Sequence, residues 1–120
     1  MSIPNNMKHG PLVLSIPGGG HRLIDQVFAA PGGIVVVEAG WSDPLRSHHA
    51  DHYIEGEVVE RTGGWSIGDF YLWPLEDDDE EHLRAAWIEW EQITKGKPKA
   101  ARRKAAADYV RRDLEIDVEI

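Results

Sequence analysis

Short apolar runs, separated by turns that contain glycine or proline, fill the first 73 residues of this 120-residue chain. Leu12, Leu14 and Ile16 alternate with other residues, as in a strand that buries one face. The unbroken β-branched run at residues 34–37 is instead typical of a strand covered on both faces. Because such turns between such runs indicate hairpins, we predict an antiparallel β-meander of about five strands, over residues 11–16, 21–28, 34–37, 52–60 and 65–73.

Residues 77–113 change to the spacing of helices. Leu83, Trp87 and Trp90 belong to one apolar stripe at helical spacing. The acidic residues 77–81 match a helix start, where carboxylates cap the chain and complement the helix dipole. Gly96 and Pro98 mark the end of this helix and the beginning of a second one. We therefore predict a two-helix hairpin that packs against the sheet.

The last residues alternate perfectly between apolar and acidic side chains. Such alternation predicts a C-terminal strand over residues 114–120 with one buried face. Its apolar side holds Leu114, Ile116, Val118 and Ile120. With the meander and the helical hairpin, this strand completes a single α+β domain over residues 1–120, since a chain of this length fits one domain.

Composition excludes several classes of protein. The chain has no cysteine, which rules out disulfides, thiolate metal sites and a cysteine nucleophile. The first ten residues are polar and lack the apolar core of a secretory signal. No apolar run approaches the ~20 residues that cross a membrane. We expect a cytoplasmic protein without a membrane partner.

Charge is segregated along the chain, and the net charge of −8 conceals this order. Residues 76–94 carry −7, residues 95–112 carry +7, and residues 113–120 carry −4. Part of this order is explained if the helices are antiparallel, because Glu80 and Glu81 would then meet Arg111 and Arg112. The net charge argues against direct binding of nucleic acid, which attracts basic domains. It favours a protein partner with a basic surface.

Two charged groups are not explained by pairing between the helices. Cations crowd the first half of the second helix, where the helix dipole disfavours them, and this basic patch comprises Lys97, Lys99, Arg102, Arg103 and Lys104. Carboxylates line one face of the final strand and also precede the first helix. We predict that these carboxylates bind the partner, together with the loop tryptophan Trp41 as an apolar anchor; they are Asp77, Asp78, Asp79, Glu80, Glu81, Glu115, Asp117 and Glu119.

The sequence contains only weak motifs for metal binding, phosphate binding or catalysis. His48, His49, Asp51 and His52 offer imidazole and carboxylate ligands of the kind that zinc prefers. Pro44 and the surrounding turn formers argue against a helix that would fix their geometry, and a solvated polar loop is the simpler interpretation. The Gly18–Gly20 turn lacks the ending of a phosphate loop. The sequence therefore calls for no cofactor, and we expect a protein that is not an enzyme.

Together these features predict a small acidic protein-binding module that inhibits a nuclease, a toxin or a nucleic-acid-binding complex by occupying its basic surface. In size, acidity and lack of cysteine the chain is similar to toxin-immunity proteins and phage anti-defence proteins such as anti-CRISPR proteins, although no motif assigns it to a family. Two alternatives stay open. One is an assembly subunit that pairs its C-terminal strand with a neighbour, as in a homo-oligomer; the other is a metal-dependent enzyme that uses the cluster His48–His52.

Overall fold

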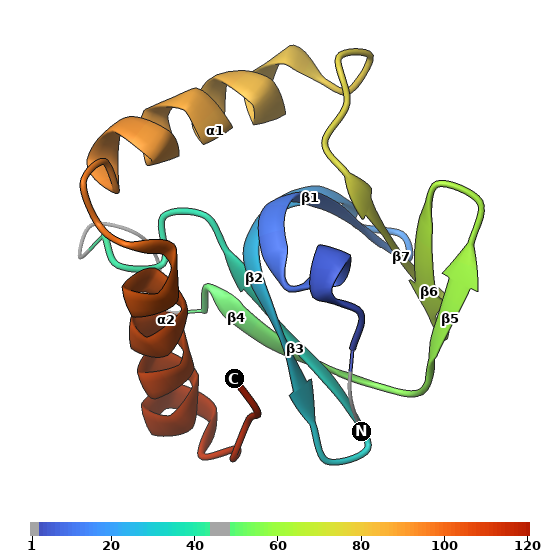
Figure 1. The fold of residues 1–120 in the computed structure, drawn as a ribbon. Coiled ribbons are helices and arrows are strands. Elements are labelled where there is room, and N and C mark those ends of the chain that lie inside the picture. The colour runs from blue at the N-terminus through green and yellow to red at the C-terminus, as the bar shows by residue number, and fades with distance from the viewer. Residues whose placement is uncertain (1–2, 44–48) are drawn as a thin grey trace.

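A strongly coiled antiparallel sheet forms the body of the protein, and two helices cover its outer side (Figure 1). The computed structural model describes residues 3–43 and 49–120. A 3₁₀ turn, η1 (Asn5–Met7), comes first. The strands are β1 (His9–Ile16), β2 (Gly20–Ala30), β3 (Gly33–Glu38), β4 (Asp51–Glu55), β5 (Val58–Arg61), β6 (Gly64–Ile67) and β7 (Phe70–Pro74). The helices are α1 (Glu81–Ile93) and α2 (Lys99–Leu114).

The α+β class with a meander sheet is confirmed, but the sheet has seven strands in the order β4-β3-β2-β1-β7-β6-β5. The two long runs predicted at residues 52–60 and 65–73 are each divided by a glycine. Gly56 has φ 131° and Gly68 has φ 58°, a region that glycine enters without the strain other residues meet. The chain turns at each of these glycines, although the alternation of apolar residues continues on both sides of the turn. Each predicted strand is therefore two strands.

The two edge strands of the sheet are consecutive in the chain, and the sheet is therefore strongly coiled. β4 and β5 occupy opposite edges, yet only Gly56 and Glu57 separate them. The inner face encloses the largest apolar cluster, which includes Leu14, Ile24 and Ile67. Met7, fully buried on η1, closes this core from the N-terminal side.

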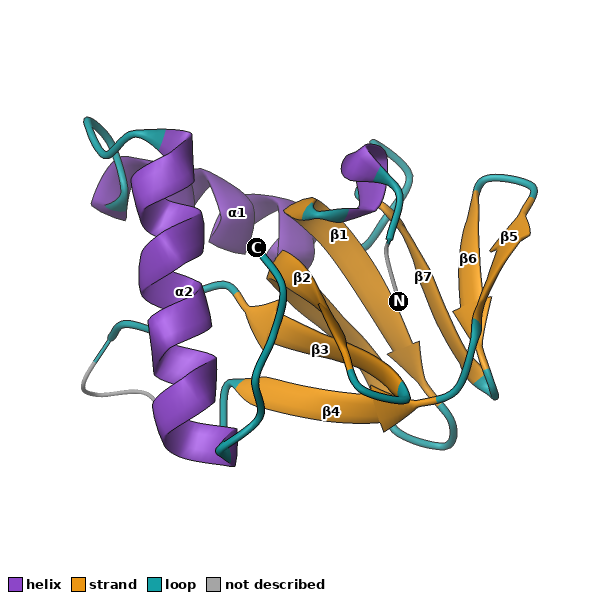
Figure 2. Ribbon diagram, turned by 60° about the horizontal axis from the view of Figure 1, so that its bottom comes forward, coloured by secondary structure: helices purple, strands orange, loops and turns teal. Residues whose placement is uncertain are grey.

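The helices cover two neighbouring parts of the outer face of the sheet. Leu83 and Trp90 of α1 pack against β1 and β2 residues, whereas alanines of α2 lie against Phe28 and Val35. Figures 1 and 2 show the two helix axes crossing at a steep angle. Among the described residues, the ion pairs expected between Glu80 or Glu81 and the arginines at the end of α2 are not formed.

The C-terminal segment is extended but is not a full strand. α2 ends at Leu114, and Glu115 follows with φ 54°. A single bridge joins Glu119 to Ala29 at the end of β2, and Figure 2 shows the segment returning alongside α2. Val118 is buried, as the alternation predicts, whereas Ile120 is 53% exposed. None of the described helices has the length and apolarity to cross a membrane.

Candidate functional site

The acidic residues before α1 form a turn rather than the first turn of the helix, which begins only at Glu81. Asp79 turns inward. Its carboxylate accepts hydrogen bonds from Trp73 Nε1, at 3.2 Å to each oxygen, and from the backbone N–H of Glu76 at 2.8 Å. Asp79 therefore stabilises the turn and is not free for a partner.

Glu80 is also occupied within the molecule. Its Oε1 lies 2.6 Å from His21 Nδ1, and its Oε2 lies 3.5 Å from His82 Nε2. The remaining acidic side chains of this segment are exposed and form no ion pair among the described residues. We call this group the acidic turn; it comprises Glu76, Asp77, Asp78 and Glu81.

Aromatic side chains of β7 and β2 lie directly behind the acidic turn. The rings of Tyr71 and Trp73 are 5.6 Å apart, and His21 meets Trp73 edge-on at 5.2 Å. Both Tyr71 and Trp73 are partly exposed. Partly exposed aromatic groups therefore lie next to the turn that carries the unpaired carboxylates.

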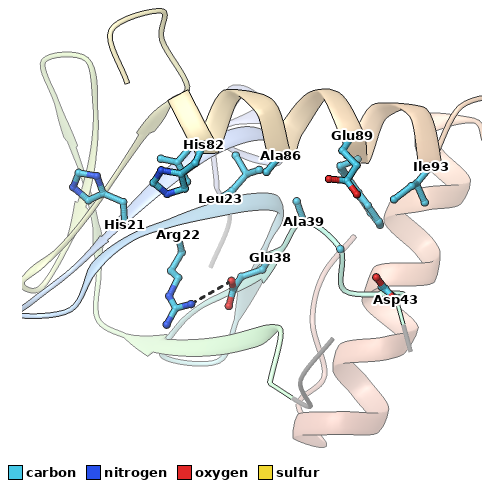
Figure 3. A pocket seen from close by; sticks show the side chains of 13 residues that line it. His21, Arg22, Leu23, Glu38, Ala39, Asp43, His82, Ala86, Glu89 and Ile93 are labelled. Atoms are coloured by element: carbon cyan, nitrogen blue, oxygen red, sulfur yellow. Dashed lines mark ion pairs between the residues drawn. The ribbon is translucent and has the colours of Figure 1, made fainter. Parts of the chain in front are cut away.

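A hollow of about 250 Å³ lies between α1 and the ends of β2 and β3. Figure 3 shows Arg22 and Glu38 facing one another below α1, with Glu89 and Ile93 of the helix at the other end. The Arg22 guanidinium lies 4.0 Å from the Glu38 carboxylate. The other oxygen of this carboxylate lies 2.7 Å from His52 Nε2. Because groups of both signs line this hollow, it selects no ligand of one charge.

The basic patch predicted on α2 is divided by the fold. Arg102 turns toward the sheet and pairs with Asp25 of β2, Nη2 to Oδ1 at 2.8 Å. Asp25 is only 1% exposed. Burial raises the pKa of this carboxyl, and the charge of Arg102 opposes the rise. The cation that the helix dipole disfavours is therefore held by a buried counter-charge.

Arg103 is buried as well, with 4% of its surface exposed. Its guanidinium lies 4.3 Å from the ring centre of Phe28. It donates to the backbone oxygens of Lys8 and Ile120, at 2.9 and 3.2 Å, and to Gln26 Oε1 at 3.2 Å. Burial lowers the pKa of Arg103. Only Lys97, Lys99 and Lys104 of the predicted patch are exposed, and Lys104 approaches Asp108 at 3.4 Å.

Trp41 is not an exposed anchor. Its indole N–H donates to Asp25 Oδ2 at 3.2 Å, and its ring lies 5.3 Å from that of Tyr109. Asp25 was not predicted as a functional or structural centre from the sequence. The available signal was a carboxylate inside the apolar run of residues 21–28, because a buried charge requires a partner.

The histidine cluster is not assembled in the described residues. His48 lies outside them, His49 is exposed, and His52 pairs with Glu38. Asp51 is buried. Burial, followed by a hydrogen bond and the charge of Asp113, raises the pKa of Asp51 to about 7. Within residues 3–43 and 49–120 no group of three or more histidine or carboxylate side chains could hold a metal.

The C-terminal carboxylates lie apart from the acidic turn. Glu115, Asp117 and Glu119 are exposed, and Asp117 approaches Arg111 at 3.6 Å. Figures 1 and 2 both place the C-terminal segment beside α2, whereas the acidic turn follows β7 at the far end of α1. The two acidic groups that the sequence joined into one surface are thus separate.

Comparison with known proteins adds no relative. No protein-family model, curated protein or solved structure shows significant similarity to this chain.

Proposed function

We propose that this chain is a small acidic protein-binding module that inhibits its partner by occupying a basic surface. The partner is a nuclease, a toxin or a nucleic-acid-binding complex, and the module works in the cytoplasm without catalysis. The binding surface is the acidic turn together with the neighbouring aromatic groups of β7. One observation carries the proposal: the acidic turn holds four exposed carboxylates that form no ion pair with the described residues.

The surface combines the two terms that a tight inhibitor needs. Unpaired carboxylates steer a basic partner toward the site and raise the association rate. Tyr71 and Trp73 then supply apolar area at low cost in side-chain entropy, as aromatic anchors do. α1 adds Ile88, which is 61% exposed. The one arginine of α1, Arg84, is half-buried and donates to the backbone oxygen of Asp79.

Affinity capture with three matched baits tests the proposal. The baits are the wild type, the acidic-turn variant D77K/D78K/E81K, and the control E55K/E57K/E60K. The control makes the same change of charge in exposed residues of β4, β5 and their connection. We expect the wild type and the control to retain one stoichiometric basic protein from native lysate, identified by mass spectrometry, and the acidic-turn variant to lose it.

Equal retention by the acidic-turn variant would remove the proposed surface. Circular dichroism melts of all three baits establish that each is folded. A retained protein whose own activity is unaffected by saturating wild-type module would leave binding intact but contradict inhibition.

A further inference from the structure

A second hollow lies where the two helices meet, and the proposed function does not use it. It has a volume of about 140 Å³ and lies between the end of α1, the start of α2 and the residues that follow β3. Figure 1 shows this junction at the opposite end of α1 from the acidic turn. A ligand bound here would therefore leave the proposed partner surface open.

Two tryptophans line the hollow. Trp90 of α1 is only 3% exposed, and Trp41 is partly exposed. Small side chains such as Thr94 and Ala101 complete much of the lining. Aromatic rings attract one another beyond the effect of the area that they bury, so the two indoles favour an aromatic ligand over an aliphatic one.

A buried carboxylate holds part of this lining in place. Asp25 is 1% exposed and accepts hydrogen bonds from Trp41 Nε1 at 3.2 Å and from Arg102 Nη2 at 2.8 Å. The ring of Trp41 also lies 5.3 Å from that of Tyr109. Because Arg102 lines the hollow as well, one carboxylate positions two of the lining side chains. Side chains that are already ordered lose little conformational freedom when a ligand binds.

The charged groups of the lining favour an anion. Arg102 is already paired with Asp25, whereas Lys97 is exposed and forms no ion pair with the described residues. No aspartate or glutamate belongs to the described lining. An acid group on the ligand would therefore meet one unpaired cation, and an ammonium group would be repelled.

We infer that this hollow binds a small aromatic carboxylate, a single ring that carries one acid group. An apolar cavity of ~150 Å³ holds one benzene molecule, so a hollow of about 140 Å³ has room for one ring. The ring would lie against Trp41 and Trp90, and the carboxylate would pair with Lys97. The pair between Arg102 and Asp25 would stay intact and keep Trp41 in position.

Titration of the intact chain with three ligands of the same ring size tests this inference. Benzoate, benzyl alcohol and benzylamine are compared at pH 7 and constant ionic strength. Calorimetry measures the dissociation constants, and NMR of the indole N–H groups of Trp41 and Trp90 locates the ligand. We expect saturable binding of benzoate with a dissociation constant at or below about 1 mM. Benzylamine should bind at least about fivefold more weakly.

Two pairs of matched variants identify the residues. A101L fills the hollow from an exposed position of α2, whereas A100L adds the same side chain at the neighbouring exposed position, outside the lining. We expect A101L to weaken benzoate binding about tenfold or more, because the added side chain occupies the space of the ring. K97Q should bring benzoate to within about twofold of benzyl alcohol. K95Q, at an exposed position outside the lining, should keep the wild-type preference.

The absence of saturable benzoate binding, or equal benzoate affinities of A101L and A100L, would overturn the site. Benzyl alcohol or benzylamine binding as tightly as benzoate would overturn the assignment of an acid group to the ligand. Neither result bears on the acidic turn, which is tested by capture of a protein partner, so the two proposals fail separately.

Discussion

Replacing Arg102 by alanine tests whether α2 turns its basic side chains into the protein. The substitution leaves the Asp25 carboxylate buried, 1% exposed, without the guanidinium 2.8 Å away. Coulomb attraction across that distance at an effective dielectric constant of ~20 is about 6 kcal/mol before desolvation is counted. Trp41 Nε1 still donates to Asp25. Since breaking a buried pair costs ~3–5 kcal/mol, we expect R102A to lose ~3 kcal/mol of unfolding free energy at pH 7.

Urea unfolding at several pH values tests this prediction most specifically, because the stability loss of R102A should depend on the charge of Asp25. Burial raises the pKa of Asp25, and removing Arg102 raises it further. A carboxyl group with a raised folded-state pKa contributes stability below its unfolded-state pKa of ~4, and that stability is lost as the pH rises through the folded-state value. The deficit of R102A should therefore be full at pH 7 and shrink as the pH falls toward ~4.

Two comparisons guard this interpretation. K104A removes an exposed pair with Asp108 and should cost less than ~0.5 kcal/mol. The double variant D25N/R102M should recover most of the loss, because the uncompensated charge is gone. A loss below ~1 kcal/mol in R102A, independent of pH, would refute the inward orientation of this side chain.

Three further substitutions test other parts of the fold. D51N should abolish a loss of stability that the wild type shows between about pH 4 and 7, because the pKa of Asp51 is raised to about 7 in the folded protein. At pH 8 the variant should be more stable than the wild type by ~1 kcal/mol. Urea midpoints at pH 4 and 8 measure this, and parallel pH profiles would contradict it. V118A should cost ~1–2 kcal/mol in thermal or urea unfolding because Val118 packs in the α2 cluster, whereas I120A, at an exposed position, should change stability by less than ~0.5 kcal/mol; equal effects would show that the C-terminal segment is not packed.

Local periodicity was enough to predict the fold class. Alternation in β1 and the apolar run of β3 identified strands, and the stripe through Leu83 and Trp90 identified α1. The number of strands required the conformation of Gly56 and Gly68, whose positive φ angles turn the chain without interrupting the apolar pattern. A period of two does not distinguish one long strand from two short ones joined by such a glycine.

The candidate site was predicted less completely, because side-chain direction depends on tertiary contacts. Asp79 and Glu80 belong to an acidic run in the sequence, yet each is bound by a neighbour from β7 or β2. Arg102 and Arg103 belong to a basic run, yet α2 packs through small residues such as Ala106 and so brings both arginines against the sheet. Charge order along a chain therefore overstates the charge that is available to a partner.

The C-terminal segment illustrates the same limit. The alternation correctly predicted that Val118 is buried. It could not predict how many backbone hydrogen bonds the segment forms with the sheet, because that number depends on the neighbouring strand. Ala29 already pairs with Ile34 of β3, and only one bridge, to Glu119, forms on its other side. Val118 packs in the protein's own core, so the C-terminal segment differs from an edge strand that is free to pair with a neighbour.

The most direct measurement of the central claim is the salt dependence of association between this module and its captured partner. Stopped-flow kinetics would compare the wild type with D77K/D78K/E81K and with E55K/E57K/E60K. We expect the acidic-turn variant to associate at least about tenfold more slowly at low salt and to lose most of the salt dependence, while the control keeps the wild-type salt dependence. Identical association rates and salt slopes for all three proteins would contradict an acidic turn that guides and binds a basic surface.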